Sequence, residues 1–196
     1  MKAEFFQERS IVSTPDLLNQ APVGATWLPN PVDCEVFFPR RPSSSKTIRV
    51  GYYDPVSDYV RQLVKPESIA KILSSQAFRR VEGVPARGLP WIKMSEYFGT
   101  LDVWIDKINM SFYGMAACEA GATGVPVITK IGEEERTFVP DCPFIDLTHQ
   151  SLQGAIEYLS EENTRRYVGS RSLDYVKRKH GAPRIVEELD RIYRSI

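Results

Sequence analysis

The feature that most constrains this chain is a regular alternation of short apolar segments with helical segments after residue 46. Apolar segments occupy residues 47–53, 78–82, 101–105, 126–129 and 144–145, and helical patterns occupy 66–75, 91–98, 113–123, 151–160, 162–179 and 183–193. Strands that alternate with helices need crossover connections and therefore favour a parallel sheet. Because the strands are apolar throughout, helices are predicted to cover both faces. The predicted fold class is therefore α/β, with a Rossmann-like parallel sheet.

Ligands of such sheets bind beyond the carboxyl ends of the strands. Four loops follow predicted strands, at residues 53–65, 83–91, 106–113 and 129–137. We expect any binding site to be built from these loops.

The first 40 residues have a different pattern. Residues 11–14 and 25–28 are predicted strands on either side of a helical turn at 15–18, and residues 38–45 form a linker rich in proline and serine. This opening unit has too little apolar surface to be stable alone, so it must dock on another part of the protein. The chain is accordingly divided into residues 1–40 and residues 41–196.

Composition excludes several functional classes. Lysine plus arginine number 25 and aspartate plus glutamate also number 25, so the basic excess of a nucleic-acid-binding protein is absent. Three widely separated cysteines and two histidines do not form the pattern of a metal centre or a disulfide framework. They suit a reducing cytoplasm, with a peripheral position at a membrane as the alternative. No run of 18 apolar residues predicts a transmembrane helix, and residues 1–9 lack the pattern of a signal peptide.

The segment with the clearest chemical content is residues 101–128, predicted as strand, loop, helix and strand. The loop leads backbone N–H groups to a helix N-terminus, where the helix dipole favours an anion. Gly114 leaves room for a phosphate or a sugar to approach, and small residues let the helix pack tightly on the sheet. Glu119 is the one charge in that helix, and its carboxylate can accept two hydrogen bonds from a ribose diol. A solvated glutamate, a turn glycine and an ordinary alanine-rich helix explain these features equally well.

Residues 119–128, Glu-Ala-Gly-Ala-Thr-Gly-Val-Pro-Val-Ile, resemble a signature of nucleotide-sugar glycosyltransferases with the GT-B fold, especially the large retaining family of the group 1 type. That signature has a glutamate, seven residues, and then Glu-Ala-Met-Ala-x-Gly-x-Pro-Val-Ile. Residues 13–18 and 27–33 resemble the stretch that precedes the linker between the two domains of these enzymes. The resemblance implies that residues 41–196 are the C-terminal, donor-nucleotide-binding domain, and that residues 1–40 are a remnant of the N-terminal acceptor domain plus the linker.

The resemblance also implies roles for individual residues. Glu119 matches the second glutamate of the signature, which holds the donor ribose. The first glutamate, which contacts the donor sugar, falls at Ser111, and this departure puts the identity of the sugar, or transfer itself, in doubt. Phe112, Tyr113 and Gly114 are expected to place backbone N–H groups near the sugar and the diphosphate.

Three further residues are assigned by the same resemblance. Arg61 and Lys65 lie where the family holds the diphosphate, although the usual glycine after the lysine is replaced by Pro66, and a solvated helix approach is the alternative. Gly83 is expected to end a strand in the loop that flanks the nucleobase. If Arg61 and Lys65 bind the diphosphate, their charges should point into the pocket that contains Gly114.

The predicted function is transfer of a sugar from a nucleotide-diphosphate donor to a sugar or a lipid-linked acceptor, this chain being the donor-binding half. The donor is a substrate, so no cofactor or metal is expected, and no catalytic residue is assigned. The last helix resembles one that crosses back to the other domain, so its apolar face at Ile185, Leu189 and Ile192 is expected to be under-covered, unless it packs on its own sheet. The alternatives are a non-enzymatic sugar-nucleotide-binding module and a GT-B sugar-nucleotide epimerase.

Overall fold

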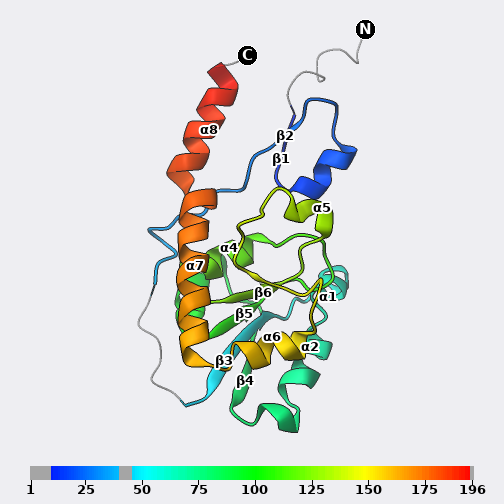
Figure 1. The fold of residues 1–196 in the computed structure, drawn as a ribbon, viewed down its shortest axis with the longest axis vertical. Coiled ribbons are helices and arrows are strands. Elements are labelled where there is room, and N and C mark those ends of the chain that lie inside the picture. The colour runs from blue at the N-terminus through cyan, green and yellow to red at the C-terminus, as the bar shows by residue number, and fades with distance from the viewer. Residues whose placement is uncertain (1–9, 40–45, 195–196) are drawn as a thin grey trace.

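The structure is a computed structural model of the 196-residue chain, and it describes residues 10–39 and 46–194. The residues on which we based the absence of a signal peptide, residues 1–9, and most of the predicted linker, residues 40–45, lie outside these ranges, as do residues 195–196. The described residues form a small N-terminal unit, a five-stranded sheet with flanking helices, and a long C-terminal helical segment (Figure 1).

The N-terminal unit is the predicted strand–turn–strand. Strand β1 (Ile11–Val12) and strand β2 (Thr26–Trp27) pair in parallel, and the 3-10 helix η1 (Pro15–Gln20) connects them. The Trp27 indole also donates a hydrogen bond to the carbonyl oxygen of Ser13. The unit is a separate two-stranded sheet, and it docks on the rest of the protein, as its small apolar content predicts, through an edge contact between Trp27 and Phe112.

The main sheet is parallel throughout and has the order β4-β3-β5-β6-β7. Its strands are β3 (Ile48–Tyr53), β4 (Val81–Ala86), β5 (Val103–Ile105), β6 (Val127–Thr129) and β7 (Ile145–Asp146). The order reverses between β3 and β5, because β4 lies on one side of β3 and all later strands lie on the other. This reversal places a topological switch point beside the loops that follow β3 and β5. The predicted α/β class is confirmed.

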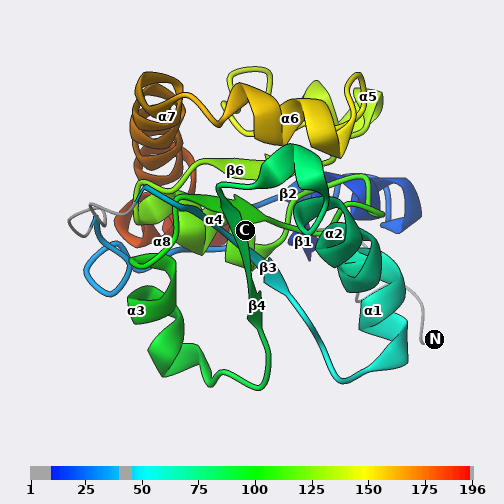
Figure 2. The ribbon, with the colours of Figure 1, turned by 90° about the horizontal axis from the view of Figure 1, so that it is seen from below.

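Helices cover both faces of the sheet, as Figure 2 shows. Helices α3 (Met94–Phe98), α4 (Met115–Ala122) and α7 (Glu162–His180) share one apolar core with the sheet, and α1 (Asp58–Val64), α2 (Pro66–Leu73) and α6 (Leu152–Tyr158) share the other. Trp104 points into the first core while its neighbours Val103 and Ile105 point into the second. Strand periodicity thus divides one apolar strand between two cores.

Gly51 shows why the first core needs a glycine in the sheet. A Cβ atom at Gly51 would collide with the Leu101 side chain and would lie 3.0 Å from the Trp104 ring. Gly51 pairs with Trp104 across the β3–β5 register, so the missing side chain makes room for the buried indole. The sequence pattern predicts a strand here, but only the packing explains the glycine.

The C-terminal helices connect the two parts of the molecule. Helix α7 ends where Val32 forms a parallel bridge with Gly181, and the Val32 amide donates to the His180 carbonyl oxygen at 2.7 Å. Helix α8 (Ala182–Arg194) follows at once and extends away from the sheet (Figure 1). Ile185 is buried on α8, whereas Leu189 and Ile192 are half-buried. The apolar face is therefore incompletely covered within the described residues, and the alternative that it packs on the sheet is wrong.

Several predicted boundaries are wrong. The loop predicted at 53–65 contains helix α1, and the loop at 129–137 contains the one-turn helix α5 (Glu133–Arg136). Strand β4 begins and ends later than predicted, so Gly83 lies inside the strand rather than at its end. The helix at 91–98 divides into the 3-10 turn η3 (Trp91–Lys93) and α3, and η2 (Gln76–Phe78) precedes β4. Gly83 and Pro85 are residues that often end a strand. In the structure β4 nevertheless pairs with β3 past both residues, as far as Ala86.

Candidate functional site

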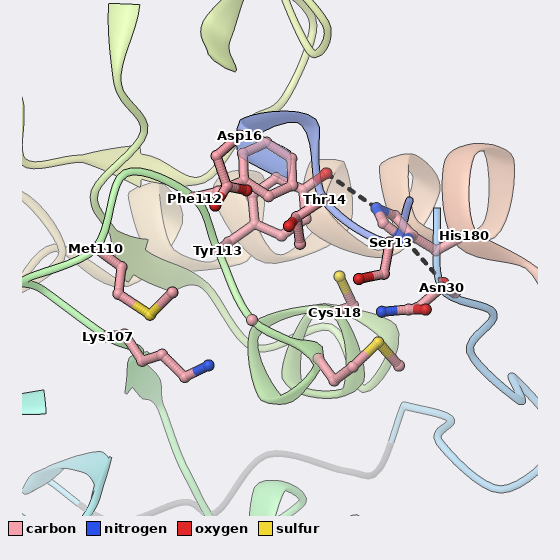
Figure 3. A pocket seen from close by; sticks show the side chains of 12 residues that line it. Ser13, Thr14, Asp16, Asn30, Lys107, Met110, Phe112, Tyr113, Cys118 and His180 are labelled. Atoms are coloured by element: carbon pink, nitrogen blue, oxygen red, sulfur yellow. Dashed lines mark hydrogen bonds between the residues drawn. The ribbon is translucent and has the colours of Figure 1, made fainter. Parts of the chain in front are cut away.

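A cavity of about 160 Å³ lies between the N-terminal unit and the beginning of α4 (Figure 3). The N-terminal unit and the segment after it form one wall, and the β5–α4 loop with α4 forms the opposite wall. The lining residues are Ser13, Thr14, Asp16, Asn30, Lys107, Met110, Phe112, Tyr113, Gly114, Met115, Cys118 and His180. Three of the predicted site residues, Phe112, Tyr113 and Gly114, are therefore brought together.

The N-terminus of α4 is held by a buried carboxylate. Asp106 directly follows β5, is 3% exposed, and accepts a hydrogen bond from the Gly114 amide at 2.7 Å. Burial raises the pKa of Asp106, while the Gly114 hydrogen bond and the Lys107 charge lower it. This contact fixes where the loop turns into the helix, and so fixes Gly114 in the cavity wall.

Lys107 is a site residue that the sequence reasoning missed. A Cβ atom added to Gly114 would lie 3.1 Å from the Lys107 ammonium and 3.4 Å from Asp106 Oδ2. The ammonium therefore lies close above the Gly114 backbone, and Figure 3 shows the Lys107 side chain on the same side of the cavity as the loop. Its position directly after a strand end, within the segment of clearest chemical content, was the signal that could have identified it.

His180 closes the opposite end of the cavity within a buried hydrogen-bonded chain. Its Nδ1 lies 3.1 Å from the Asn30 carbonyl oxygen, and its Nε2 lies 2.9 Å from the Tyr113 hydroxyl, which in turn lies 2.7 Å from the Tyr175 hydroxyl. Because a carbonyl oxygen only accepts, Nδ1 must carry the proton and Nε2 must accept from Tyr113. Burial lowers the pKa of His180 to about 4, so the ring is neutral at physiological pH. The network joins the segment that follows the N-terminal unit, at Asn30, to the wall of the cavity.

Glu119 lies outside the lining of this cavity. It is 8% exposed, and its Oε1 accepts a hydrogen bond from the Trp91 indole at 2.8 Å. Burial is the largest influence on Glu119 and raises its pKa, against a smaller lowering by the Trp91 hydrogen bond. The lone charge of α4 is therefore not a solvated helix residue but a buried carboxylate with a specific partner, which rules out the simplest alternative for this position.

Arg61 and Lys65 are not among the residues that line the cavity. The Arg61 guanidinium binds Asp54 at 2.6 Å, the Pro55 carbonyl oxygen at 3.0 Å, and Glu67. Lys65 is exposed and occupies the left-handed region, with φ 58°, between α1 and α2. Two carboxylates thus neutralise Arg61 at the β3 end of the sheet, and neither cation points into the cavity that contains Gly114.

Ser111 and Gly83 also lie away from this cavity. Ser111 is exposed, and its carbonyl oxygen accepts a hydrogen bond from the Gly132 amide at 2.8 Å, which ties the β5–α4 loop to the loop after β6. A Cβ atom at Gly83 would lie 3.1 Å from the Leu73 side chain, so this glycine packs under α2. The loop that follows β4 begins at Arg87.

Among residues 10–39 and 46–194, no group of three or more His, Cys, Asp or Glu side chains is arranged to hold a metal ion. In the same two ranges, no helix is both long enough and apolar enough to cross a membrane.

No protein-family model matches the sequence. No curated protein matches it either. Solved structures do match its fold. Sucrose-phosphate synthase from Thermosynechococcus elongatus is 18% identical with a TM-score of 0.65, over 95% of this chain and 58% of that one. Anabaena HepE in complex with UDP-glucose is 13% identical with a TM-score of 0.64, over 95% and 63%.

A third match is restricted to one domain. The C-terminal domain of a group 1 family glycosyl transferase, LpcC from Francisella tularensis, is 14% identical with a TM-score of 0.52, over 77% of this chain and 99% of that domain. The chain thus spans about 58–63% of the length of the two larger structures. Its fold is that of the C-terminal part of GT-B glycosyltransferases, as the sequence resemblance predicts.

Proposed function

We propose that this chain is the donor-nucleotide-binding half of a nucleotide-sugar glycosyltransferase, which acts together with an acceptor-binding domain beyond residues 1–40. The observation that carries the proposal is the cavity at the start of α4, where Gly114 and the Lys107 ammonium lie together beyond the carboxyl end of β5. Structures with the same fold hold UDP and UDP-glucose. The acceptor, a sugar or a lipid-linked sugar, would approach from the side of the N-terminal unit.

A diphosphate fits the chemistry of this cavity. The N-terminus of α4 favours an anion through its dipole, and Gly114 permits a close approach of the phosphate oxygens. Lys107 supplies the positive charge that stabilises the ground-state diphosphate and also the diphosphate that leaves when the sugar is transferred. Arg61 contributes only if its ion pairs with Asp54 and Glu67 open, which costs two contacts. Lys65 is exposed and does not line the cavity, so it has no part in this proposal.

Glu119 supplies the ribose contact in this proposal. Its carboxylate lies in the same helix as the phosphate-binding end, is buried outside the cavity lining, and accepts a hydrogen bond from the Trp91 indole. A carboxylate that accepts hydrogen bonds from both ribose hydroxyls would fix the distance between the ribose and the diphosphate.

A sugar-nucleotide-binding module without transfer is the second candidate, and Ser111 favours it. At the position where the resemblance places a sugar-binding glutamate, this chain has a neutral, exposed serine outside the cavity. Such a protein would bind the nucleotide as well as an enzyme does but would not orient the sugar. Transfer assays with the acceptor-binding domain present separate the two candidates.

Calorimetric titration with uridine and UDP, and with the matched adenosine and guanosine pairs, tests nucleotide binding. We expect one nucleoside diphosphate to bind at least tenfold more tightly than its nucleoside, with a smaller difference at high salt because salt screens the charges. Lys107→Met should reduce that difference to a few-fold, whereas the matched change Arg61→Met should leave most of it. Equal binding of nucleoside and diphosphate would exclude the proposed diphosphate site. Loss of the difference in Arg61→Met alone would return the role to Arg61.

A further inference from the structure

Trp91 makes a contact that the proposed function leaves unexplained. The side chain is 55% exposed and projects from η3, yet its indole N–H reaches inward to Oε1 of Glu119, at 2.8 Å. The ring is also held from the other side by an edge contact with Phe37, with centroids 5.6 Å apart. Two anchors on a large exposed aromatic residue indicate that its position is specified.

The Glu119 carboxylate needs such a partner when no nucleotide is bound. It is 8% exposed, and a buried carboxylate without a hydrogen-bond donor is strongly unfavourable. The Trp91 indole provides one N–H donor and no competing acceptor. The Trp91 indole therefore keeps the carboxylate hydrogen-bonded, while the rest of the Trp91 side chain remains exposed to solvent.

A ribose diol would need the same acceptor atoms. Two vicinal hydroxyls that both donate to one carboxylate use both of its oxygens, and the half-exposed Trp91 indole lies against Oε1 of a carboxylate that is only 8% exposed. We propose that Trp91 is a specificity-determining residue of the nucleotide site, whose indole N–H stands in for a ribose hydroxyl on Glu119 until a ribonucleotide displaces it. This inference rests on the proposed function, because it assumes that a nucleotide binds beside Glu119.

Replacement of the indole N–H by a ribose hydroxyl affects how well the site distinguishes a ribonucleotide from its 2′,3′-dideoxy analogue. When a ribose hydroxyl takes the place of the indole on Oε1, the Trp91–Glu119 hydrogen bond is lost, so in this proposal Trp91 weakens ribonucleotide binding. A 2′,3′-dideoxynucleotide has no hydroxyls to donate and leaves that bond in place. Trp91 therefore keeps the Glu119 carboxylate hydrogen-bonded when the dideoxynucleotide binds. Trp91 therefore narrows the difference in affinity between the two ligands.

The test uses Trp91→Phe, which keeps an aromatic ring against Phe37 but removes the N–H donor. The ligands are whichever of UDP, ADP and GDP the unmodified chain binds most tightly, and its 2′,3′-dideoxy analogue. We expect the ratio of their affinities to widen by about fivefold, as the loss of one competing hydrogen bond implies. Any contact between the ring face and the base is common to both ligands and cancels in this ratio. Ile92→Ala, a change at the exposed neighbouring residue, should leave the ratio unchanged.

The indole N–H signal in NMR spectra gives a second readout. The Trp91 signal is assigned by its absence in Trp91→Phe, and its shift on saturation should be larger with the ribonucleotide than with the dideoxy analogue, because only the ribonucleotide replaces its hydrogen bond. An unchanged affinity ratio, or a Trp91 signal that responds equally to both ligands, would overturn the inference while leaving nucleotide binding intact. If no nucleoside diphosphate binds any of the variants, the proposed function itself fails, and the role of Trp91 fails with it.

Discussion

Single residues of the candidate site differ in how much of their role their sequence position could reveal. Glu119 combines a position that matches a ribose-binding glutamate with burial, and its side chain accepts a hydrogen bond from an indole that a ligand could replace. Lys107 has no counterpart in the motif, yet it lies over Gly114. Glu119 is thus the residue that the sequence singled out most clearly, and Lys107 is the residue that only the structure added.

Substitution of Glu119 distinguishes ligand binding from a purely structural role. Glu119→Gln keeps the shape but removes the charge, so charge-assisted hydrogen bonds to the ribose hydroxyls weaken by roughly 1.5–3 kcal/mol. We expect about a tenfold or greater loss of affinity for the ribonucleotide in calorimetric titration, and a much smaller loss for the 2′,3′-dideoxy analogue. If both ligands lose affinity equally, Glu119 does not contact the ribose.

His180 makes the stability of the chain depend on pH. Its pKa in the folded chain is about 4, below the value of 6.5 for an exposed histidine, so the unfolded chain binds the proton first as the pH falls. Stability is therefore complete above pH 6.5 and declines between about 6.5 and 4. Linkage predicts a fall of about 2 kcal/mol in the free energy of unfolding between pH 7 and pH 5.

Urea unfolding of the wild type and His180→Asn at a series of pH values measures this dependence. Asparagine can still donate to the Asn30 carbonyl oxygen but does not titrate, so the variant should lose stability at pH 7 and show a flatter profile between pH 7 and 5. The raised pKa values of Asp106 and Glu119 act in the opposite direction, and they are common to both proteins. Parallel profiles for the two proteins would show that His180 is not the source.

Element packing around the site depends on small residues in α4 and α7. These two helices pack against each other on one face of the sheet. A Cβ atom at Gly121 of α4 would lie 3.0 Å from Val176 of α7, and one at Gly169 of α7 would overlap the carbonyl oxygen of Gly124. The position of α4, and hence of Gly114 and Glu119, is set by how closely α7 and the sheet can approach it.

A matched pair of glycine substitutions tests this close approach. Gly169→Ala should lower the free energy of unfolding by about 1–3 kcal/mol, because the backbone of the α4–β6 turn must move, even though alanine favours helix by about 1 kcal/mol. Gly154→Ala in α6 is the control, since its new Cβ meets only the Ser151 side-chain oxygen, at 3.3 Å. It should be neutral or stabilising by up to about 1 kcal/mol. Thermal unfolding of both variants measures these changes. Equal effects of the two substitutions on stability would show that α7 tolerates a side chain at residue 169.

At the scale of the whole molecule, the cavity lies between two parts of the chain. The N-terminal unit supplies one wall, and the Val32–Gly181 bridge together with the Asn30–His180 hydrogen bond holds that unit against the end of α7. The chain spans only 58–63% of the larger structures that share its fold. We therefore expect the described cavity to be one side of a larger site.

The isolated chain should bind its nucleotide but transfer no sugar. Transfer needs donor and acceptor positioned together, and this positioning contributes several kcal/mol to catalysis. With UDP-glucose and other sugar nucleotides, release of the nucleoside diphosphate should not exceed the rate without protein, whereas addition of an acceptor-binding domain should raise it if the protein is an enzyme. Sugar transfer by residues 1–196 alone would refute this expectation.

The sequence by itself determined the class of fold, and it predicted the loops from which a site should be built. Apolar periodicity is a local property, so it predicted the parallel sheet, the helices on both faces, the separate N-terminal unit and the loop at 106–113. The run 111–128 identified Gly114, Phe112 and Tyr113, which the structure places in one cavity wall. Glu119 was predicted from the same run, as the one charge in a helix of small residues.

Only the tertiary structure decided how charges and aromatic rings pair, because those partners are distant in sequence. Trp91 lies 28 residues from Glu119, and His180 lies 150 residues from Asn30. Asp54 and Glu67 engage Arg61 because α1, absent from the prediction, turns the guanidinium toward them. Lys107 reaches Gly114 because Asp106 folds the loop back onto the start of α4. Local pattern fixes which elements form, whereas the packing of those elements decides which side chains meet.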